Sequence, residues 1–117
     1  MQSRRPINAV FFRTEAGNEP VREWLKGLSK EDRINIGADI RTVQNIWPVG
    51  KPLVDHLGDQ IWEVRSGLKD RIARTLFTIQ HQEMILLHGF IKKERKTPHE
   101  DLALAKKRKT QYLQFHE

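Results

Sequence analysis

The sequence predicts an α+β domain in which helices pack on one face of a small, mainly antiparallel sheet. Apolar residues recur at helical spacing in two consecutive early segments and in one segment near the end. Between them lie three stretches rich in β-branched and aromatic residues, separated by short turns, and such neighbouring strands pair antiparallel. The 117 residues suit one domain, expected over residues 1–117 in the order β-α-α-β-β-β-α.

The first half is expected to hold one strand and a helical hairpin. The short apolar segment 9–12 predicts the strand. A first helix is expected from Pro20 to about Gly27, and Ser29, with Asp32 three residues later, predicts the start of a second that Pro48 ends. The apolar stripes of the two helices are Val21, Trp24, Leu25 and Leu28, then Ile36, Ile40, Val43 and Trp47. The short joint between them predicts a helical hairpin.

The second half is expected to hold three strands and a last helix. Residues 48–59 contain two Pro and two Gly and are expected to form a loop. Strands are predicted at 61–65, 71–80 and 84–92. Thr97 as N-cap, with Pro98 and Glu100 behind it, predicts a helix that runs to about Phe115. Its apolar stripe is thin and consists of Leu102, Ala105 and Tyr112.

Composition bounds the functional classes. The sequence has no cysteine and no apolar run long enough to cross a membrane, and no signal peptide follows its N-terminal arginines, so a cytoplasmic protein without disulfides is expected. The net charge is +6, and nearly all the excess lies in the second half, which favours polyanionic partners. The basic run 106–109 fits a solvated helix face equally well. The five histidines have no ligand-like spacing, and no phosphate loop or nucleophile elbow occurs, so neither metal nor cofactor is expected.

Three segments together resemble the RelE/ParE toxin superfamily, and within it the HigB-like branch related to phage Gp49 proteins. They are Glu-Pro-Val-Arg-Glu-Trp-Leu at 19–25, Ile-Trp-Glu-Val-Arg at 61–65 with Arg-Ile-Ala-Arg at 71–74, and Leu-Leu-His-Gly-Phe-Ile-Lys-Lys at 86–93 followed by Lys96-Thr97-Pro98. The resemblance implies a RelE-like fold and a cytosolic type II toxin, a metal-independent mRNA endoribonuclease that acts on the translating ribosome. It also implies a helix-turn-helix antitoxin of the HigA kind, with operator DNA contacted only through that antitoxin and no membrane partner.

Two other functions stay open at this stage. The ParE branch shares the fold but acts on DNA gyrase and needs no nuclease activity. A phage-derived accessory protein that binds nucleic acid is the third reading. Basic residues at strand ends favour an activity on RNA, since a toxin directed at a protein needs no phosphate-binding site. An antitoxin with an acidic or apolar surface is expected to cover the basic site or to hold the first helices.

The candidate site follows from what RNA cleavage requires. A base must take the 2′-OH proton, cations must balance the charge on the phosphorane, and an acid must protonate the leaving 5′-oxygen. By the resemblance, Arg74 matches a central-strand arginine that stabilises phosphate, and its planar guanidinium suits that role. Lys92 is expected as general acid or phosphate clamp, and Arg65 as a second clamp or as the partner of Glu63. The expected RNA- and phosphate-binding residues are Lys93, Arg71, Lys96 and His99.

Strand geometry limits this set. Arg71 and Arg74 point to opposite faces of a regular strand, so at most one belongs to the site, and a turn-end surface charge is favoured for Arg71. Lys92 and Lys93 alternate in the same way. The tyrosine that RelE-like nucleases often place near the start of the last helix has no counterpart here, because Tyr112 lies far along that helix and His99 is the nearest titratable residue. The general base is therefore unassigned.

Several other conspicuous residues are expected to be structural. For His88, a hydrogen-bonded core position is favoured over a catalytic base. Gly89 is expected to permit close packing or a bulge. The tryptophans are expected in the core, and not as platforms for stacking bases: Trp24, Trp47 and Trp62.

Overall fold

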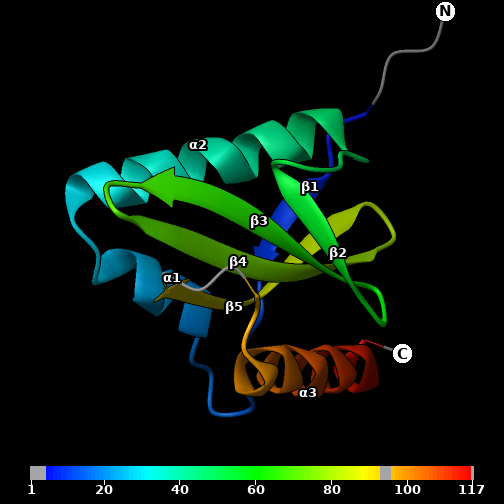
Figure 1. Ribbon diagram of the computed structural model, residues 1–117. Coiled ribbons are helices and arrows are strands. Elements are labelled where there is room, and N and C mark those ends of the chain that lie inside the picture. The colour runs from blue at the N-terminus through cyan, green and yellow to red at the C-terminus, as the bar shows by residue number, and fades with distance from the viewer. Residues whose placement is uncertain (1–4, 93–95, 117) are drawn as a thin grey trace, which may run out of the picture.

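A computed structural model describes residues 5–92 and 96–116, and in it a five-stranded sheet lies between two helical layers (Figure 1). The elements are β1 (Asn8–Phe11), α1 (Pro20–Lys26), α2 (Lys30–Ile46), β2 (Val54–Gly58), β3 (Ile61–Leu68), β4 (Arg71–Gln80), β5 (Glu83–Lys92) and α3 (His99–Phe115). The strand order is β1-β5-β4-β3-β2, with β1 parallel to β5 and every other pair antiparallel. The predicted α+β class with a small, mainly antiparallel sheet is confirmed, and the fold is consistent with a RelE-like one.

The helical hairpin forms as its sequence predicts. Pro20 opens α1, where its fixed φ suits a first turn, and Gly27 ends it. The hydroxyl of Ser29 accepts a hydrogen bond from the backbone N–H of Asp32 at 3.2 Å, which caps α2. The buried residues of α2 are the expected Ile36, Ile40 and Val43.

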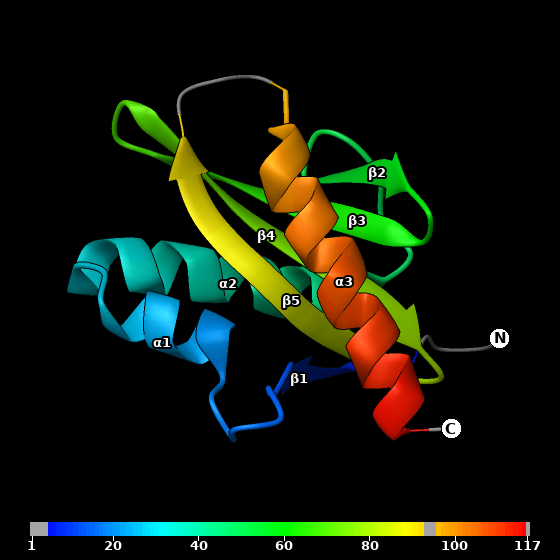
Figure 2. The same cartoon turned by 90° about the horizontal axis from the view of Figure 1, so that it is seen from below.

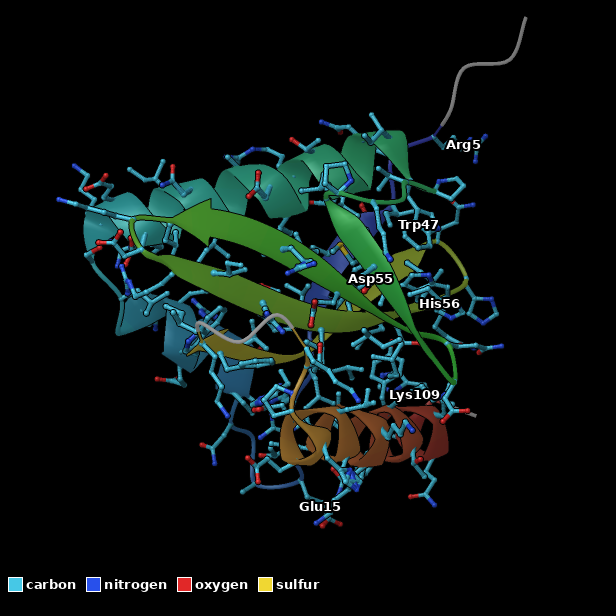
Figure 3. All side chains as sticks on the ribbon, viewed as in Figure 1. Arg5, Glu15, Trp47, Asp55, His56 and Lys109 are labelled. Atoms are coloured by element: carbon cyan, nitrogen blue, oxygen red, sulfur yellow. The ribbon has the colours of Figure 1, made fainter. Side chains whose placement is uncertain are left out.

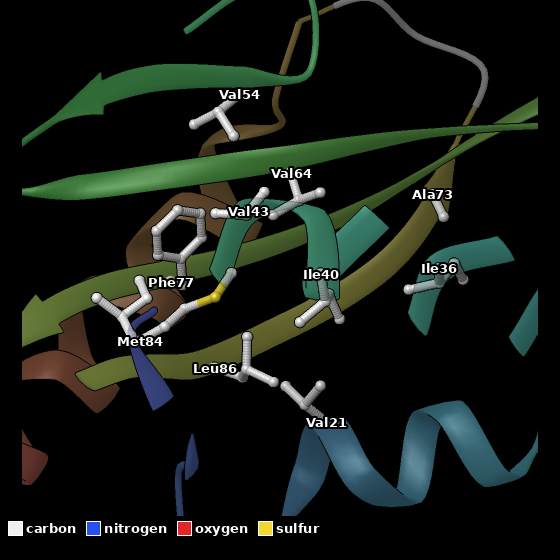
Figure 4. Packing of buried hydrophobic residues seen from close by; sticks show 11 residues of the cluster. Val21, Ile36, Ile40, Val43, Val54, Val64, Ala73, Phe77, Met84 and Leu86 are labelled. Carbon is white, nitrogen blue, oxygen red and sulfur yellow. The ribbon is translucent and has the colours of Figure 1, made fainter. Parts of the chain in front are cut away.

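These two helices cover one face of the sheet and form the larger core (Figure 4). Val21 of α1 and the apolar stripe of α2 pack on Val64, Phe77 and Leu86 of three neighbouring strands. The three tryptophans are partly buried against this core, which confirms their expected structural role. The ring centroids of Trp47 and Trp62 lie 5.1 Å apart, edge to face.

Gly89 permits the closest of these contacts. A Cβ atom at this position would lie 2.1 Å from Cε3 and 2.3 Å from Cζ3 of Trp24, so α1 packs directly on the backbone of β5. The expectation of close packing is confirmed. A register shift also occurs nearby, because Leu76 pairs with His88 and Phe77 with Leu86, which leaves Leu87 as the extra residue.

The last helix lies on the opposite face of the sheet, so the expectation that all helices share one face was wrong (Figure 2). In that view α3 crosses in front of the sheet while α2 lies behind it. The reason is that β4 and β5 are apolar on both faces: Leu76, Leu87 and Phe90 form a second core with Ala105 and Tyr112 of α3. Nη1 of Arg108 also donates to the carbonyl of Leu87 at 2.9 Å.

Two local expectations were also wrong. The predicted loop 48–59 contains β2, an edge strand of five residues that pairs only with β3. Thr97 is not the N-cap of α3: Pro98 takes that position without a side-chain cap, and the Thr97 hydroxyl instead donates a hydrogen bond to Glu63. None of the helices in the described part of the chain is long and apolar enough to cross a bilayer.

Candidate functional site

The sheet register brings the three predicted catalytic residues onto one face. Arg65 of β3 lies directly opposite Arg74 of β4, which lies opposite Phe90 of β5, and Lys92 follows two residues later. Phe90 belongs to the core under α3, so this row of side chains faces the last helix. We call the following group the α3-side site: Glu63, Arg65, Arg74, His88, Lys92 and Asp101.

Arg74 is the buried centre of the α3-side site. Its side chain has no exposed surface, and its positive charge acts on the carboxylate of Glu63, which is only 1% exposed. Burial raises the pKa of Glu63, and the hydrogen bond from Thr97 and the charges of Arg74 and Arg65 offset part of that rise. Nε of Arg65 lies 3.7 Å from Oε1 of Glu63, so the pairing that the sequence left open for Arg65 is present. Because Arg74 has no exposed surface, a phosphate can contact it only after the side chains that cover it move.

A second charged group lies at the edge of the same face. Nε2 of His88 is 2.7 Å from Oδ1 of Asp101, in the first turn of α3, and Nζ of Lys92 is 3.2 Å from Oδ2 of the same carboxylate. Burial is the largest influence on the pKa of His88 and lowers it, while the hydrogen bond and charge of Asp101 oppose the shift. A neutral imidazole at pH 7 can accept a proton, so His88 combines the hydrogen-bonded position that the sequence favoured with the capacity to act as a base.

The other predicted residues lie outside the α3-side site or at its margin. Arg71 is on the α2 face, where Nη2 is 2.9 Å from Oδ2 of Asp32, and the opposite orientation of Arg71 and Arg74 that the strand period predicts is confirmed. Lys96 and His99 are exposed just before and at the start of α3. Lys93 lies outside the described residues.

Sequence reasoning missed Asp101 entirely and used Glu63 only as a surface partner of Arg65. The only signal for Asp101 was its place in an acidic first turn of a helix, which reads equally well as favourable interaction with the helix dipole. For Glu63 the signal was its position on an apolar strand, one residue from Trp62 and Val64. The contact of His88 with Asp101, thirteen residues further along the chain, depends on how α3 packs, and neither segment indicates that packing.

Two other features lie apart from this site. A cavity of about 730 Å³ is lined by β1, the segment after it and the C-terminal end of α3, including Arg13, Tyr112 and His116. The exposed residues Arg5, Glu15 and His56 are spread around the molecule and do not gather at the α3-side site (Figure 3). Within residues 5–92 and 96–116, no three His, Asp or Glu side chains are placed to hold a metal ion.

Comparison with known proteins shows the class of this chain and then its family. The fold is consistent with RelE-like toxins. The family model described as Phage derived protein Gp49-like (DUF891) matches residues 23–110, and the family belongs to the RelE/ParE-like toxin group. The chain therefore belongs to the Gp49-like family of toxin-antitoxin-related toxins, and the match includes the whole α3-side site. No curated protein matches the chain.

Proposed function

We propose that the protein is the toxin of a type II toxin-antitoxin system and that it cleaves mRNA on the translating ribosome without a metal ion. The observation that carries this proposal is the gathering of two cations and a histidine on one face of the sheet. Arg65 and Lys92 are 29% and 34% exposed, and His88 lies on the same strand as Lys92. Partly exposed cations over a buried cationic centre suit a chain of phosphates better than a protein surface.

Some residues contact the RNA, and others stabilise the site from beneath. Arg65 and Lys92 bind the oxygens of the scissile phosphate and balance the charge that develops in the transition state. Arg74, which is covered, stabilises the buried Glu63 and contributes positive potential from beneath in a medium of low dielectric constant. The exposed Lys96 and His99, together with Lys93, bind neighbouring phosphates of the RNA. Arg71 has no part in this arrangement because it faces α2 and is paired with Asp32.

The nucleic-acid partners follow from the same chemistry, and the antitoxin follows from the family. mRNA and the ribosome present a dense array of phosphates to the basic second half of the chain. The antitoxin is a HigA-like helix-turn-helix protein, it blocks the toxin through an acidic or apolar surface, and it alone contacts operator DNA. On the same family grounds we propose that the protein belongs to the HigB-like branch and acts in the cytoplasm.

The test is induction of the wild type, Arg65→Gln and Lys92→Gln in cells, with primer extension on cellular mRNA. Arg41→Gln is the matched control, because Arg41 is an exposed arginine on α2, on the other side of the sheet. We expect the wild type and Arg41→Gln to arrest growth and to produce cuts within translated codons. Arg65→Gln and Lys92→Gln are expected to accumulate as folded protein with far fewer cuts.

Growth arrest with intact mRNA would overturn the proposal. Inhibition of DNA supercoiling by gyrase would then be the activity to measure, as the ParE-like alternative requires. Equal cutting by the wild type and both variants would leave a ribonuclease whose site lies elsewhere. Arg74→Ala is a poor first variant, because it would leave the Glu63 carboxylate buried beside one cation fewer.

A further inference from the structure

Asp101 holds His88 in one orientation and one protonation state. A carboxylate can only accept a hydrogen bond, so the 2.7 Å contact places the ring proton of neutral His88 on Nε2. Nδ1 is then the lone-pair nitrogen, and within the described residues it makes no hydrogen bond. The side chains of His88 and Asp101 are 15% and 12% exposed, so the pair is sheltered but still reaches the surface.

The same carboxylate also holds Lys92. Its second oxygen accepts from Nζ at 3.2 Å, while Oε1 of Glu100 lies 3.8 Å from Nζ. Phe90 fills the space between the two basic side chains, since its ring stacks with His88 at 5.4 Å and lies 5.8 Å from Nζ of Lys92. A histidine and a lysine on the same strand face are therefore joined by one acidic group.

We propose that His88 is the general base of the cleavage reaction, Lys92 the general acid, and Asp101 the positioning residue that returns the proton from one to the other. This inference rests on the proposed ribonuclease function. Nδ1 of His88 takes the proton of the RNA 2′-OH, the 2′-oxygen bonds to phosphorus, and the bond from phosphorus to the 5′-oxygen breaks as Nζ of Lys92 protonates that oxygen. The products are a 2′,3′-cyclic phosphate and a 5′-hydroxyl.

The step leaves His88 protonated and Lys92 neutral. Asp101 contacts both side chains, so it can pass a proton between them. The Nε2 proton of His88 moves to Oδ1 of Asp101, and the carboxyl group gives a proton to Nζ of Lys92. The proton on Nδ1 of His88 then moves to Nε2 through solvent, which regenerates the starting state. The RNA itself is the only reactant, and no oxidant, reductant or further group is needed.

The surroundings of His88 suit a base that is neutral before the reaction. The charged groups that face it are Asp101 and Arg108 of α3 and Lys92 of its own strand, while its β4 neighbour, Leu76, is apolar. Burial and the two cations lower the pKa of His88, and Asp101 opposes them. In the cleavage reaction this predicts a rate that falls as the pH drops through the pKa of His88, below its ordinary value.

The experiment measures cleavage by purified protein in a translation extract from pH 5 to 8, together with the NMR titration of His88 in the same protein. The variants are His88→Gln, Asp101→Asn and Asp101→Glu. The control is His56→Gln, because His56 is an exposed histidine of β2 that stacks on Trp62 on the other face. We expect His88→Gln to lose about 10²–10⁴-fold in rate and to lose the acid limb of the pH profile. Asp101→Asn should slow cleavage and move the acid limb to lower pH, because His88 loses the carboxylate that positions it. Asp101→Glu should be faster than Asp101→Asn, and His56→Gln should match the wild type.

Each failure has its own signature. If the wild type makes no cuts while it arrests growth, the proposed function itself falls, and this inference with it. If the wild type cuts and His88→Gln cuts at the same rate with the same pH profile, only the inference is overturned. Should His88→Gln not fold, the wild type still decides: an acid limb whose midpoint differs from the NMR pKa of His88, or 5′-phosphate ends in place of 5′-hydroxyls, overturns it.

Discussion

Gly89→Ala tests the packing of α1 on the sheet. A methyl group at this position would lie 2.1, 2.3 and 2.7 Å from three atoms of the Trp24 ring, whereas carbon atoms in contact normally lie about 3.5–4.0 Å apart. The ring or the strand must therefore move by more than about 1 Å, in an interior packed as densely as a crystal. Overpacking of this kind costs about 1–3 kcal/mol, and the depth of the overlap predicts a loss near 3 kcal/mol from the free energy of unfolding.

The assay is urea denaturation followed by tryptophan fluorescence. Gly67→Ala is the matched control, because Gly67 lies in β3 with no atom within 4 Å of the added carbon, and we expect a change below about 1 kcal/mol there. Trp24→Leu combined with Gly89→Ala should cost less than the sum of the two single changes, since the smaller side chain removes the clash. A Gly89→Ala protein within about 0.5 kcal/mol of the wild type, or strictly additive changes, would refute this account of the contact.

Three further predictions concern capping and the buried charges. Ser29→Ala should lower the free energy of unfolding by about 1 kcal/mol because the Asp32 N–H loses its cap, and thermal unfolding of the variant beside the wild type would measure it. Arg74→Met should cost about 3–5 kcal/mol by leaving Glu63 buried with less compensation, and adding Glu63→Gln should restore part of that loss in urea melts. The pKa of Glu63 is raised in the folded protein, so its stabilising contribution is full below its ordinary pKa and is lost as the pH rises through the folded value. Glu63→Gln should therefore gain stability relative to the wild type between pH 4 and 7, and a pH-independent difference would contradict this.

The elements that sequence predicts well are those whose signals are local. The hairpin of α1 and α2 follows from apolar periodicity and from Ser29, whose cap is made within four residues. The opposite orientation of Arg71 and Arg74 follows from the strand period, which the backbone imposes whatever the surroundings. The gathering of Arg65 opposite Arg74 follows once the short β3–β4 turn fixes the register.

The missed features depend on neighbours far along the chain. β2 is an edge strand with one partner, so its residues need not be apolar and resemble a loop. Helical periodicity tells which side of α3 is buried, but not which face of the sheet receives it. The contact between His88 and Asp101 exists only because α3 packs on that face, and nothing near either residue specifies the partner. The candidate site is thus half predictable. Arg65, Arg74 and Lys92 follow from the sequence, whereas the buried position of Glu63 and the contact between His88 and Asp101 do not.

The parallel strand β1 has a consequence for synthesis. Asn8 and Phe11 pair with Glu83 and Leu86, so β1 has no partner until β5 has been translated. α3 is made after β5, and Asp101 comes with it. Because chains emerge from the ribosome N-terminus first, the sheet closes late and the α3-side site is completed later still. A nascent chain of this protein therefore cannot assemble the α3-side site before α3 has been translated.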